Sequence, residues 1–352
     1  MKKIGLAIVI ILLFIGTGII PSTAQNIEKP SLPTSRGNTL YVGGNGPGNF
    51  TKIQDAIDNA SAGDTVFVYD DSAPYNENIN VNKLIYLYGE DRNTTTILGY
   101  VHVRADFVTI SNFTIEYDMS VWGSSNVTIR QNNVKNIGLD IRDCSNVTVS
   151  MNALQGYTGN SASSLEFWNC SRVNITGNTF TSVDGTMYCC ALITTNDCII
   201  SDNIFTNSDY GLLVLSCARV SIMGNDFIDI LLGGIDISRF SKQFPSHIEI
   251  RRNNFINVSY GISLSNCRWT TVVENNFINT SDCMWFLGFG NVWDKNYWGR
   301  PRLLPKPIYG WFHYLIPSLM RYLIPGWFQN LVLIPTLVKF DWHPAQEPYD
   351  IP

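Results

Sequence analysis

One eight-residue phrase, V-x-I-x-x-N-x-F, recurs along most of the chain and constrains its fold more than any other feature. Successive copies start 20 to 28 residues apart. Their asparagines are Asn132, Asn152, Asn178, Asn203, Asn225, Asn253 and Asn275, with a variant copy at Asn296. A second phrase, a glycine followed by alternating apolar residues, recurs between the copies, as in GLDI from Gly138 and GIDI from Gly234. Both phrases have a period of two, which predicts short strands that each bury one face.

A repeat of this length that holds only short strands and turns cannot bury its own apolar face, so it must stack on copies of itself. Leucine-rich repeats have a similar period, but their helical half and leucine spacing are absent here. The sequence therefore predicts an all-β, single-stranded parallel β-helix, with about ten coils between Thr65 and Trp298. In each coil we expect Val and Ile to point inward and Phe to fill the next inner position. The Asn is expected at a bend, where it tolerates an unusual φ and bonds to the Asn of the next coil.

The first residues are typical of an export signal. Lys2 and Lys3 precede an apolar run over 4–20, and small residues before Gln25 resemble a cleavage site. We expect 1–24 to be a signal peptide or an uncleaved N-terminal anchor and 25–37 to be a linker, so that the chain is extracellular or at the cell surface. Only 15% of the residues are charged, and the net charge of −5 gives no basic footprint for nucleic acid.

Export affects how cysteines and asparagines are interpreted. Cys144, Cys170, Cys217 and Cys267 share one register, where stacked small apolar groups at a corner explain them. Cys144 and Cys170 lie on successive coils, within the range that a disulfide needs. The Asn-X-Ser/Thr pattern predicts glycosylation at Asn93, Asn126, Asn146, Asn174, Asn257 and Asn279, although the repeated phrase generates several such sites by itself.

Both ends of a β-helix expose strand edges that must be covered. Near 51–60, the residues Thr51–Gln54 fit a capping box and the apolar residues after them have helical spacing, which predicts a short helix over the first coil. Residues 38–299 then form the β-helix. Residues 300–352 form an irregular tail rich in proline and aromatic residues. This tail either folds back over the last coil or lies in a membrane interface, and its frequent prolines favour the cap.

The stretch Asn49–Ile97, which begins NFTKIQDAIDNASAGDTVFVY, resembles the opening of pectin-lyase-like right-handed β-helix proteins. The later repeats and the terminal FDWHPAQEPYDI resemble the NosD-like repeat proteins of archaeal cell surfaces. This resemblance covers residues 38–299 and implies a right-handed coil. The G-x-V-D-F-I-F-G and Y-Q-D-T-L contexts of pectinesterases are absent, as is any Met/His cluster that could hold copper in the way the NosD resemblance would require.

The glycine-led phrase aligns a column of outward residues on successive coils. Its members are Asp140, Glu166, Ala191, Leu213, Asp236 and Ser263. Asp140 and Glu166 are on neighbouring coils, about 5 Å apart by stacking, which is near the separation of a retaining glycosidase pair. The same pair is suited to Ca²⁺. Arg142 and Trp168 flank the column and can contact a sugar or cover a turn, while solvated acids on a polar face are the simpler explanation.

The sequence identifies no reaction, because it contains no Ser-His-Asp order, phosphate loop or zinc-ligand spacing. The leading hypothesis is an exported, non-enzymatic cell-surface protein that is structural or binds glycans, without a cofactor. One alternative is a polysaccharide lyase or hydrolase that acts through the acidic column. A second alternative is a metal-handling accessory protein of the NosD type.

Overall fold

The computed structural model describes residues 37–136, 138–157, 163–183, 188–286, 288–313 and 333–351. These residues belong to one compact unit. The signal segment and the linker expected before residue 37 lie outside the described residues, so both stay predictions.

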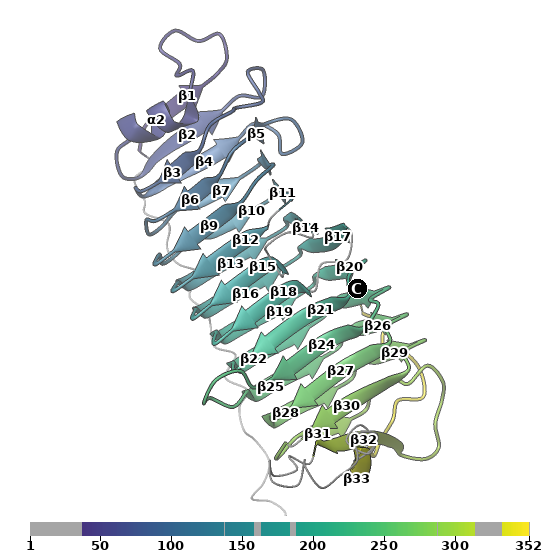
Figure 1. The fold of residues 1–352 in the computed structure, drawn as a ribbon. Coiled ribbons are helices and arrows are strands. Elements are labelled where there is room, and N and C mark those ends of the chain that lie inside the picture. Colours follow the sequence, from purple (N-terminus) through teal and green to yellow (C-terminus); the bar gives the residue numbers. More distant parts are fainter. Residues whose placement is uncertain are drawn as a thin grey trace, which may run out of the picture. The chain divides into compact units, whose positions relative to one another are not determined.

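Three sheets, parallel except for one antiparallel pair at the C-terminal end, form the sides of a right-handed parallel β-helix (Figure 1). Sheet A contains β1 (Thr39–Val42), β2 (Asp64–Val68), β4 (Ile85–Gly89), β7 (Thr109–Ser111), β10 (Thr128–Arg130), β13 (Ser145–Ser150), β16 (Ser171–Thr176), β19 (Asn196–Ser201), β22 (Ala218–Met223), β25 (Ser246–Arg251), β28 (Arg268–Val273) and β31 (Val292–Asp294). Sheet B contains β5 (Thr96–Ile97), β8 (Thr114–Ile115), β11 (Asn133–Val134), β14 (Ala153–Tyr157), β17 (Thr179–Val183), β20 (Ile204–Thr206), β23 (Asp226–Ile228), β26 (Asn254–Ile256) and β29 (Asn276–Ile278). Sheet C contains β3 (Ile79–Val81), β6 (Val101–Val103), β9 (Met119–Trp122), β12 (Leu139–Arg142), β15 (Ser163–Trp168), β18 (Tyr188–Ile193), β21 (Tyr210–Leu215), β24 (Gly233–Ser238), β27 (Tyr260–Ser265), β30 (Asp282–Phe286), β32 (Lys306–His313) and β33 (Leu333–Asp341).

The predicted fold class is confirmed, with about 11 turns rather than about ten. The strand β1 accounts for a turn before Thr65, because it pairs in parallel with β2. Each copy of the repeated phrase supplies a strand of sheet A, then a corner, then a strand of sheet B. The alternation works as expected: Val173 and Ile175 of β16 are buried, whereas Thr176 is half-buried on the outer face.

The phenylalanines of the phrase form a stacked inner row in sheet B. Ring centroids of Phe180, Phe205, Phe227, Phe255 and Phe277 follow one another at 4.7–4.9 Å, and Trp298 ends the row. The glycine of the second phrase makes room for these rings. A Cβ atom on Gly234 would lie 2.7 Å from the ring of Phe255, and one on Gly261 would lie 2.6 Å from the ring of Phe277. The two phrases are therefore coupled by packing.

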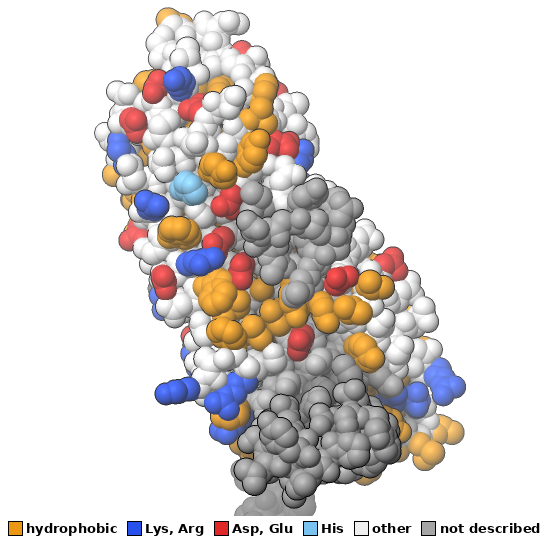
Figure 2. Space-filling view, in the orientation of Figure 1, with side chains coloured by type: hydrophobic (Ala, Val, Ile, Leu, Met, Phe, Trp, Pro, Cys, Tyr) orange, Lys and Arg blue, Asp and Glu red, His pale blue; other side chains and the backbone are white. Residues whose placement is uncertain are grey.

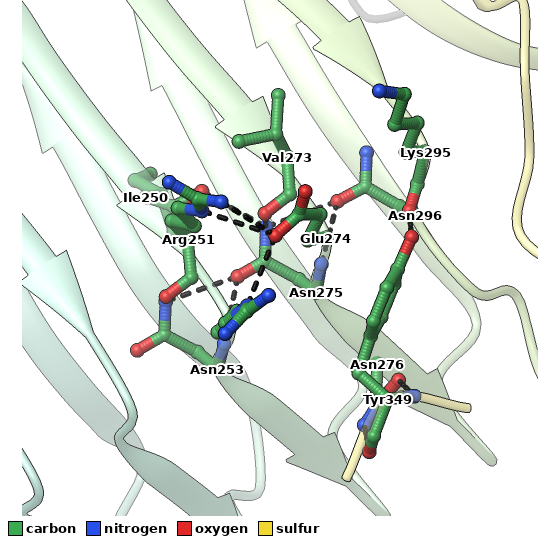
Figure 3. Close-up of polar contacts among 11 residues, drawn as sticks. Ile250, Arg251, Asn253, Val273, Glu274, Asn275, Asn276, Lys295, Asn296 and Tyr349 are labelled. Carbon is green, nitrogen blue, oxygen red and sulfur yellow. Dashed lines mark hydrogen bonds and ion pairs between the residues drawn. The ribbon is translucent and has the colours of Figure 1, made fainter. Parts of the chain in front are cut away.

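The asparagines of the phrase form a continuous buried ladder at the corner between sheets A and B, part of which is drawn in Figure 3. In each step the side-chain carbonyl of one Asn accepts both the backbone N–H and the side-chain N–H of the preceding Asn. Between Asn253 and Asn275, for example, both distances are 3.0 Å. The side-chain amide also donates to two backbone carbonyls, as Asn275 does to Ile250 and Val273. One part of the expectation was wrong: the left-handed φ belongs to the residue before each Asn, such as Glu274, and not to the Asn.

Asp341 ends this ladder at the C-terminal side. Its side chain is fully buried, and Oδ2 accepts hydrogen bonds from the backbone and side-chain N–H groups of Asn296 at 2.9 and 3.0 Å. The indole N–H of Trp298 donates to the same oxygen at 3.0 Å. Since every Asn in the ladder donates its backbone N–H and a side-chain N–H to the next Asn, the last step needs an acceptor, and a carboxylate is the strongest one available.

The short helix α2 (Ile53–Asn59) covers the first turns and buries Ile53, Ala56 and Ile57. The predicted capping box at Thr51–Gln54 is wrong, because the N-cap is Lys52 and no side chain of that segment caps the helix. Instead, the carboxylate of Glu77 accepts the N–H groups of Ile53 and Gln54 at 2.8 and 3.0 Å.

A lysine holds the other end of α2. Lys83 Nζ donates to the carbonyls of Ile57, Asp58 and Ala60. A carboxylate thus caps the N-terminus of the helix and an ammonium group caps its C-terminus. Each charge is opposite in sign to the helix dipole at that end, which is the favourable arrangement.

All eight cysteines are buried, and Cys144 and Cys170 are thiols in this structure, while the disulfide suggested between them stays a prediction. Their thiols have another use at the corner of the coil. Cys144 Sγ donates to the carbonyl of Arg142 at 3.0 Å and accepts the N–H of Ser124, and Cys170 Sγ accepts the N–H of Cys144. Thr195 takes the same position on the next coil and makes equivalent contacts. The side chains at this corner therefore form hydrogen bonds with backbone groups, in addition to the apolar packing that we expected.

The tail adds two strands to sheet C and then crosses the last turn. β32 pairs in parallel with β30, and β33 pairs antiparallel with β32. Beyond Asp341, Ala345 N donates to the carbonyl of Asn296, and Asn276 exchanges two hydrogen bonds with the backbone of Tyr349 (Figure 3). Residues 314–332 lie outside the described residues, so the choice between a cap and a membrane-interface segment stays a prediction. No helix in the described part of the chain has the length and apolar character to cross a membrane.

We expect Ile175→Asp to unfold the protein or lower its melting temperature severely, because a carboxylate without a partner would replace a fully buried side chain, at a cost of several kcal/mol. The neighbouring Thr176→Asp variant is the matched control and should melt close to the wild type. Thermal unfolding followed by circular dichroism compares the two. Equal melting temperatures would show that the inward and outward positions are assigned wrongly.

We also expect Asp341→Ala to lower the free energy of unfolding by at least about 2 kcal/mol, since it leaves two buried donors, the backbone N–H of Asn296 and the indole N–H of Trp298, without an acceptor. Asp341→Asn keeps an acceptor oxygen and should lose less. Asp350→Ala, which removes an exposed carboxylate from the same tail, is the control. If denaturant melts of the Asp341→Ala and Asp350→Ala variants coincide, Asp341 does not terminate the ladder in solution.

Candidate functional site

The predicted acidic column exists on the outer face of sheet C. Strand pairing aligns Asp140 with Glu166, Glu166 with Ala191, Ala191 with Leu213, Leu213 with Asp236, and Asp236 with Ser263. Toward the N-terminus the same column continues through Ser120 and His102, which form a 2.6 Å hydrogen bond through Oγ and Nδ1. Sequence reasoning missed this extension, although His102 and Ser120 occupy the same place in their coils as Asp140 does.

The column carries closely spaced negative charge at its centre. Arg142 Nε donates to both carboxylate oxygens of Asp140, at 2.9 and 2.8 Å. Burial raises the pKa of Glu166, and the charge of Asp140 adds to the rise while Trp168 and Arg142 oppose it. Burial, followed by the charge of Asp140, likewise raises the pKa of Asp118, which the sequence did not single out. Arg142 therefore interacts with three neighbouring carboxyl groups, those of Asp118, Asp140 and Glu166.

A row of alternating arginine and tryptophan residues lies beside the column. Each member of the row comes two residues after the column residue of its own coil. The Arg104 guanidinium lies over the indole of Trp122 at 5.6 Å, and that of Arg142 lies over Trp168 at 5.7 Å. Strand pairing places Arg142 between Trp122 and Trp168. We call these four residues the Arg–Trp row. Sequence analysis identified Arg142 and Trp168, which lie two residues after Asp140 and Glu166. Trp122 lies two residues after Ser120 of the column, so the same spacing would have identified it.

The loop after β24 borders the Arg–Trp row. Phe240 meets Trp168 edge-to-face with ring centroids 6.2 Å apart, and the N–H groups of Phe240 and Ser241 donate to Ser216 Oγ. The loop therefore reaches back from β24 toward β15. Phe240 itself is 62% exposed, which leaves an apolar ring available at the border of the site.

Tyrosines line the opposite side of the column. Tyr188 and Tyr210 pair in register on β18 and β21, with ring centroids 4.8 Å apart, and Tyr260 lies two strands further on. Burial raises the pKa of Tyr188 to about 12, with the charge of Asp236 as the next cause. Burial also raises the pKa of Asp236. We call Tyr188, Tyr210 and Tyr260 the tyrosine edge, and sequence reasoning did not identify it.

Among the described residues, neither of the two best-formed hollows lies on this face. The two best-formed hollows of the described chain lie at the ends of the stack, one beside Trp293 and Lys339 and the other beside Tyr41 and Asp71. Figure 2 shows a band of hydrophobic side chains across the middle of the visible face, with acidic and basic side chains at its borders. A strip of mixed apolar and charged groups is suited to a polymer that lies along it, whereas small ligands are usually bound in closed pockets.

Metal binding has limited support in this geometry. Among the residues that the structure describes, no group of three or more His, Cys, Asp or Glu side chains is arranged to hold a metal ion. At the pair suggested for Ca²⁺, Arg142 already binds both oxygens of Asp140, so a cation would have to displace the guanidinium. The Ca²⁺ site stays a prediction.

The predicted glycosylation sites fall into two groups. Asn93, Asn257 and Asn279 are exposed, whereas Asn126, Asn146 and Asn174 are half-buried. The amides of Asn257 and Asn279 take part in an outer ladder, in which Asn257 donates to Asp229 at 2.9 Å and Asn279 donates to Asn257 at 2.8 Å. Glycosylation at any of the six stays a prediction, and the exposed sites are the accessible ones.

Comparison with known proteins supports the fold and says less about function. The family model of the right-handed β-helix region matches residues 119–296, which is just over half of the chain. The A-module of mannuronan C-5 epimerase AlgE4 from Azotobacter vinelandii superposes with a TM-score of 0.55 at 13% identity, covering 66% of this chain and 76% of that one. PfbA, a surface adhesin of Streptococcus pneumoniae, superposes with a TM-score of 0.50 at 15% identity, covering 70% and 80%. No curated protein matches the sequence.

We predict that Glu166→Gln raises the melting temperature at pH 7 by about 1–2 °C, because the half-buried carboxyl is destabilising when ionised. The pKa of Glu166 is raised on folding, so its stability cost is present above the folded pKa and disappears as the pH falls toward the unfolded pKa. The gain should therefore vanish below about pH 4. Glu249→Gln, on the exposed face of sheet A, is the control. A gain that is the same at pH 4 and pH 7 would contradict the assigned cause.

Proposed function

The chain belongs to the right-handed β-helix family, and we propose that it is an exported, cell-surface protein that binds glycans along the outer face of sheet C without cleaving them. The observation that carries the proposal is the Arg–Trp row beside the acidic column. Aromatic rings offer flat apolar surfaces for the faces of sugar rings, and carboxylates and guanidinium groups exchange hydrogen bonds with hydroxyls. The superposed adhesin and epimerase support this assignment only at the level of the fold.

The geometry explains how the site is held ready for a ligand. Strand pairing fixes the spacing of the side chains, and the stacking of Arg142 on Trp168 fixes the indole plane. Trp122 is 47% exposed, so its ring is available without rearrangement. A preorganised surface loses little conformational entropy on binding, which favours recognition of a weakly interacting polymer.

A catalytic role for the acidic column is the second candidate. The raised pKa of Glu166 beside a carboxylate resembles the division of roles in a glycosidase, in which one carboxyl stays protonated. Against it, both oxygens of Asp140 bind Arg142, so Asp140 is poorly placed to attack a sugar. The metal-handling alternative would require stoichiometric copper binding that survives a chelating wash.

To test the proposal, the full chain is screened on a glycan array, and the best-bound glycan is titrated by calorimetry. We expect Trp168→Ala to weaken binding at least fivefold, because it removes a stacking surface and the support of Arg142. Trp269→Ala is the matched control, since Trp269 is a half-exposed tryptophan on sheet A, away from the site.

Two outcomes would contradict the proposal. The first is the absence of binding to any glycan. The second is turnover of a polysaccharide, seen as new reducing ends, that is abolished by Asp140→Ala or Glu166→Ala, which would make the protein an enzyme.

A further inference from the structure

The tyrosine edge and Asp236 form a second cluster on sheet C, in which Tyr188 lies one strand away from Glu166 and Asp236 lies three strands away. The intervening strands carry Ala191 and Leu213 in the column, so the polar and charged groups gather at two places with a small apolar stretch between them. With strands about 4.8 Å apart, Asp236 is about 14 Å from Glu166 along the stack. A single sugar cannot contact both.

The tyrosine edge brings polar groups beside Asp236. Tyr188 and Tyr210 stack at 4.8 Å with an interplanar angle of 26°, and both are half-buried. Within the described chain, neither phenol hydroxyl hydrogen-bonds to another residue. Gly233, the next residue in this row, leaves room for Tyr210, since a Cβ atom there would lie 3.0 Å from its ring. Because the rings stack on each other, they present their edges and hydroxyls beside the carboxyl of Asp236.

The charge of the strip indicates which glycans fit. Arg142 interacts with Asp118, Asp140 and Glu166 and is already paired with Asp140, and Asp236 adds a fourth carboxyl on β24. A chain of uronic acids would bring further carboxylates against this excess of negative charge. An uncharged chain meets no such repulsion, and its hydroxyls can donate to the carboxylates.

We propose that Tyr188, Tyr210 and Asp236 form a second sugar subsite and that the ligand is a linear, uncharged glycan that lies along the stack and spans both clusters. This inference rests on the proposed function, since the first subsite is the Arg–Trp row beside Glu166. The strand spacing is close to the length of one pyranose unit in an extended chain, so successive sugars meet successive strands. The ligand therefore needs at least about four units to reach from Trp168 to Tyr210 and Asp236.

The experiment measures affinity against chain length with the full chain, using cello- and manno-oligosaccharides of two to six units. For the wild type we expect the affinity to rise at least tenfold between two and six units, because only longer chains reach the second subsite. Tyr210→Ala should abolish this rise and leave binding of the dimer unchanged. Trp168→Ala should weaken binding at every length. Tyr86→Ala, which truncates a half-buried tyrosine on sheet A, is the matched control and should behave like the wild type.

The outcomes separate the two proposals. If oligosaccharides bind but Tyr210→Ala leaves the length dependence intact, the second subsite is wrong and the proposed function stands. Binding of alginate oligosaccharides as tight as that of the uncharged series would overturn the assigned ligand class. If no series binds to the wild type, both this inference and the glycan-binding proposal fail. Melting curves for each variant establish that the fold is intact.

Discussion

The buried asparagine ladder is the interaction on which the rest of the structure depends. At the corner between sheets A and B the chain turns with its backbone inside the protein, where unpaired N–H and C=O groups are costly. Each Asn satisfies one N–H from the coil before it and two carbonyls, and it also bonds to its counterparts on both neighbouring coils, as Asn253 and Asn275 show (Figure 3). Because the same bonds must form at every level, all coils share one register.

Because all coils share one register, outward residues that are far apart in sequence align in columns on the surface. Loops of different length leave the coil at its corners, yet the ladder returns each chain segment to the same position, so Asp140 and Glu166 align although 26 residues separate them in sequence. The Arg–Trp row and the tyrosine edge exist for the same reason. A candidate site on this fold is therefore found by counting along each strand from the repeated buried residues to the outward positions. A local sequence motif does not reveal it.

The parts of the structure that could be predicted are those governed by this periodicity. The period-two phrases, the repeated Asn and the stacked Phe define the coil, and counting from them placed Asp140, Glu166 and Asp236 in one column. The contacts that sequence analysis missed join residues outside the repeated phrases, so the period of the repeat does not predict them. Glu77 caps a helix that begins 24 residues earlier, and Asp341 ends a ladder whose last Asn is 45 residues before it. The left-handed residue before each Asn varies, as Glu274 and Gly224 show, so its identity reveals little.

The ladder and the acidic column treat buried polar groups in opposite ways. Every asparagine amide in the ladder meets a partner, and the carboxylate of Asp341 accepts the donors at its end, so that polarity contributes to stability. On sheet C, by contrast, burial raises the pKa of Asp118, Glu166 and Asp236, which means that the ionised groups are destabilising at neutral pH. The ladder sets the register of the coils without these three acids, so the fold has no structural need for them. Under the proposed function, these half-buried carboxyls would accept hydrogen bonds from the hydroxyls of a bound glycan.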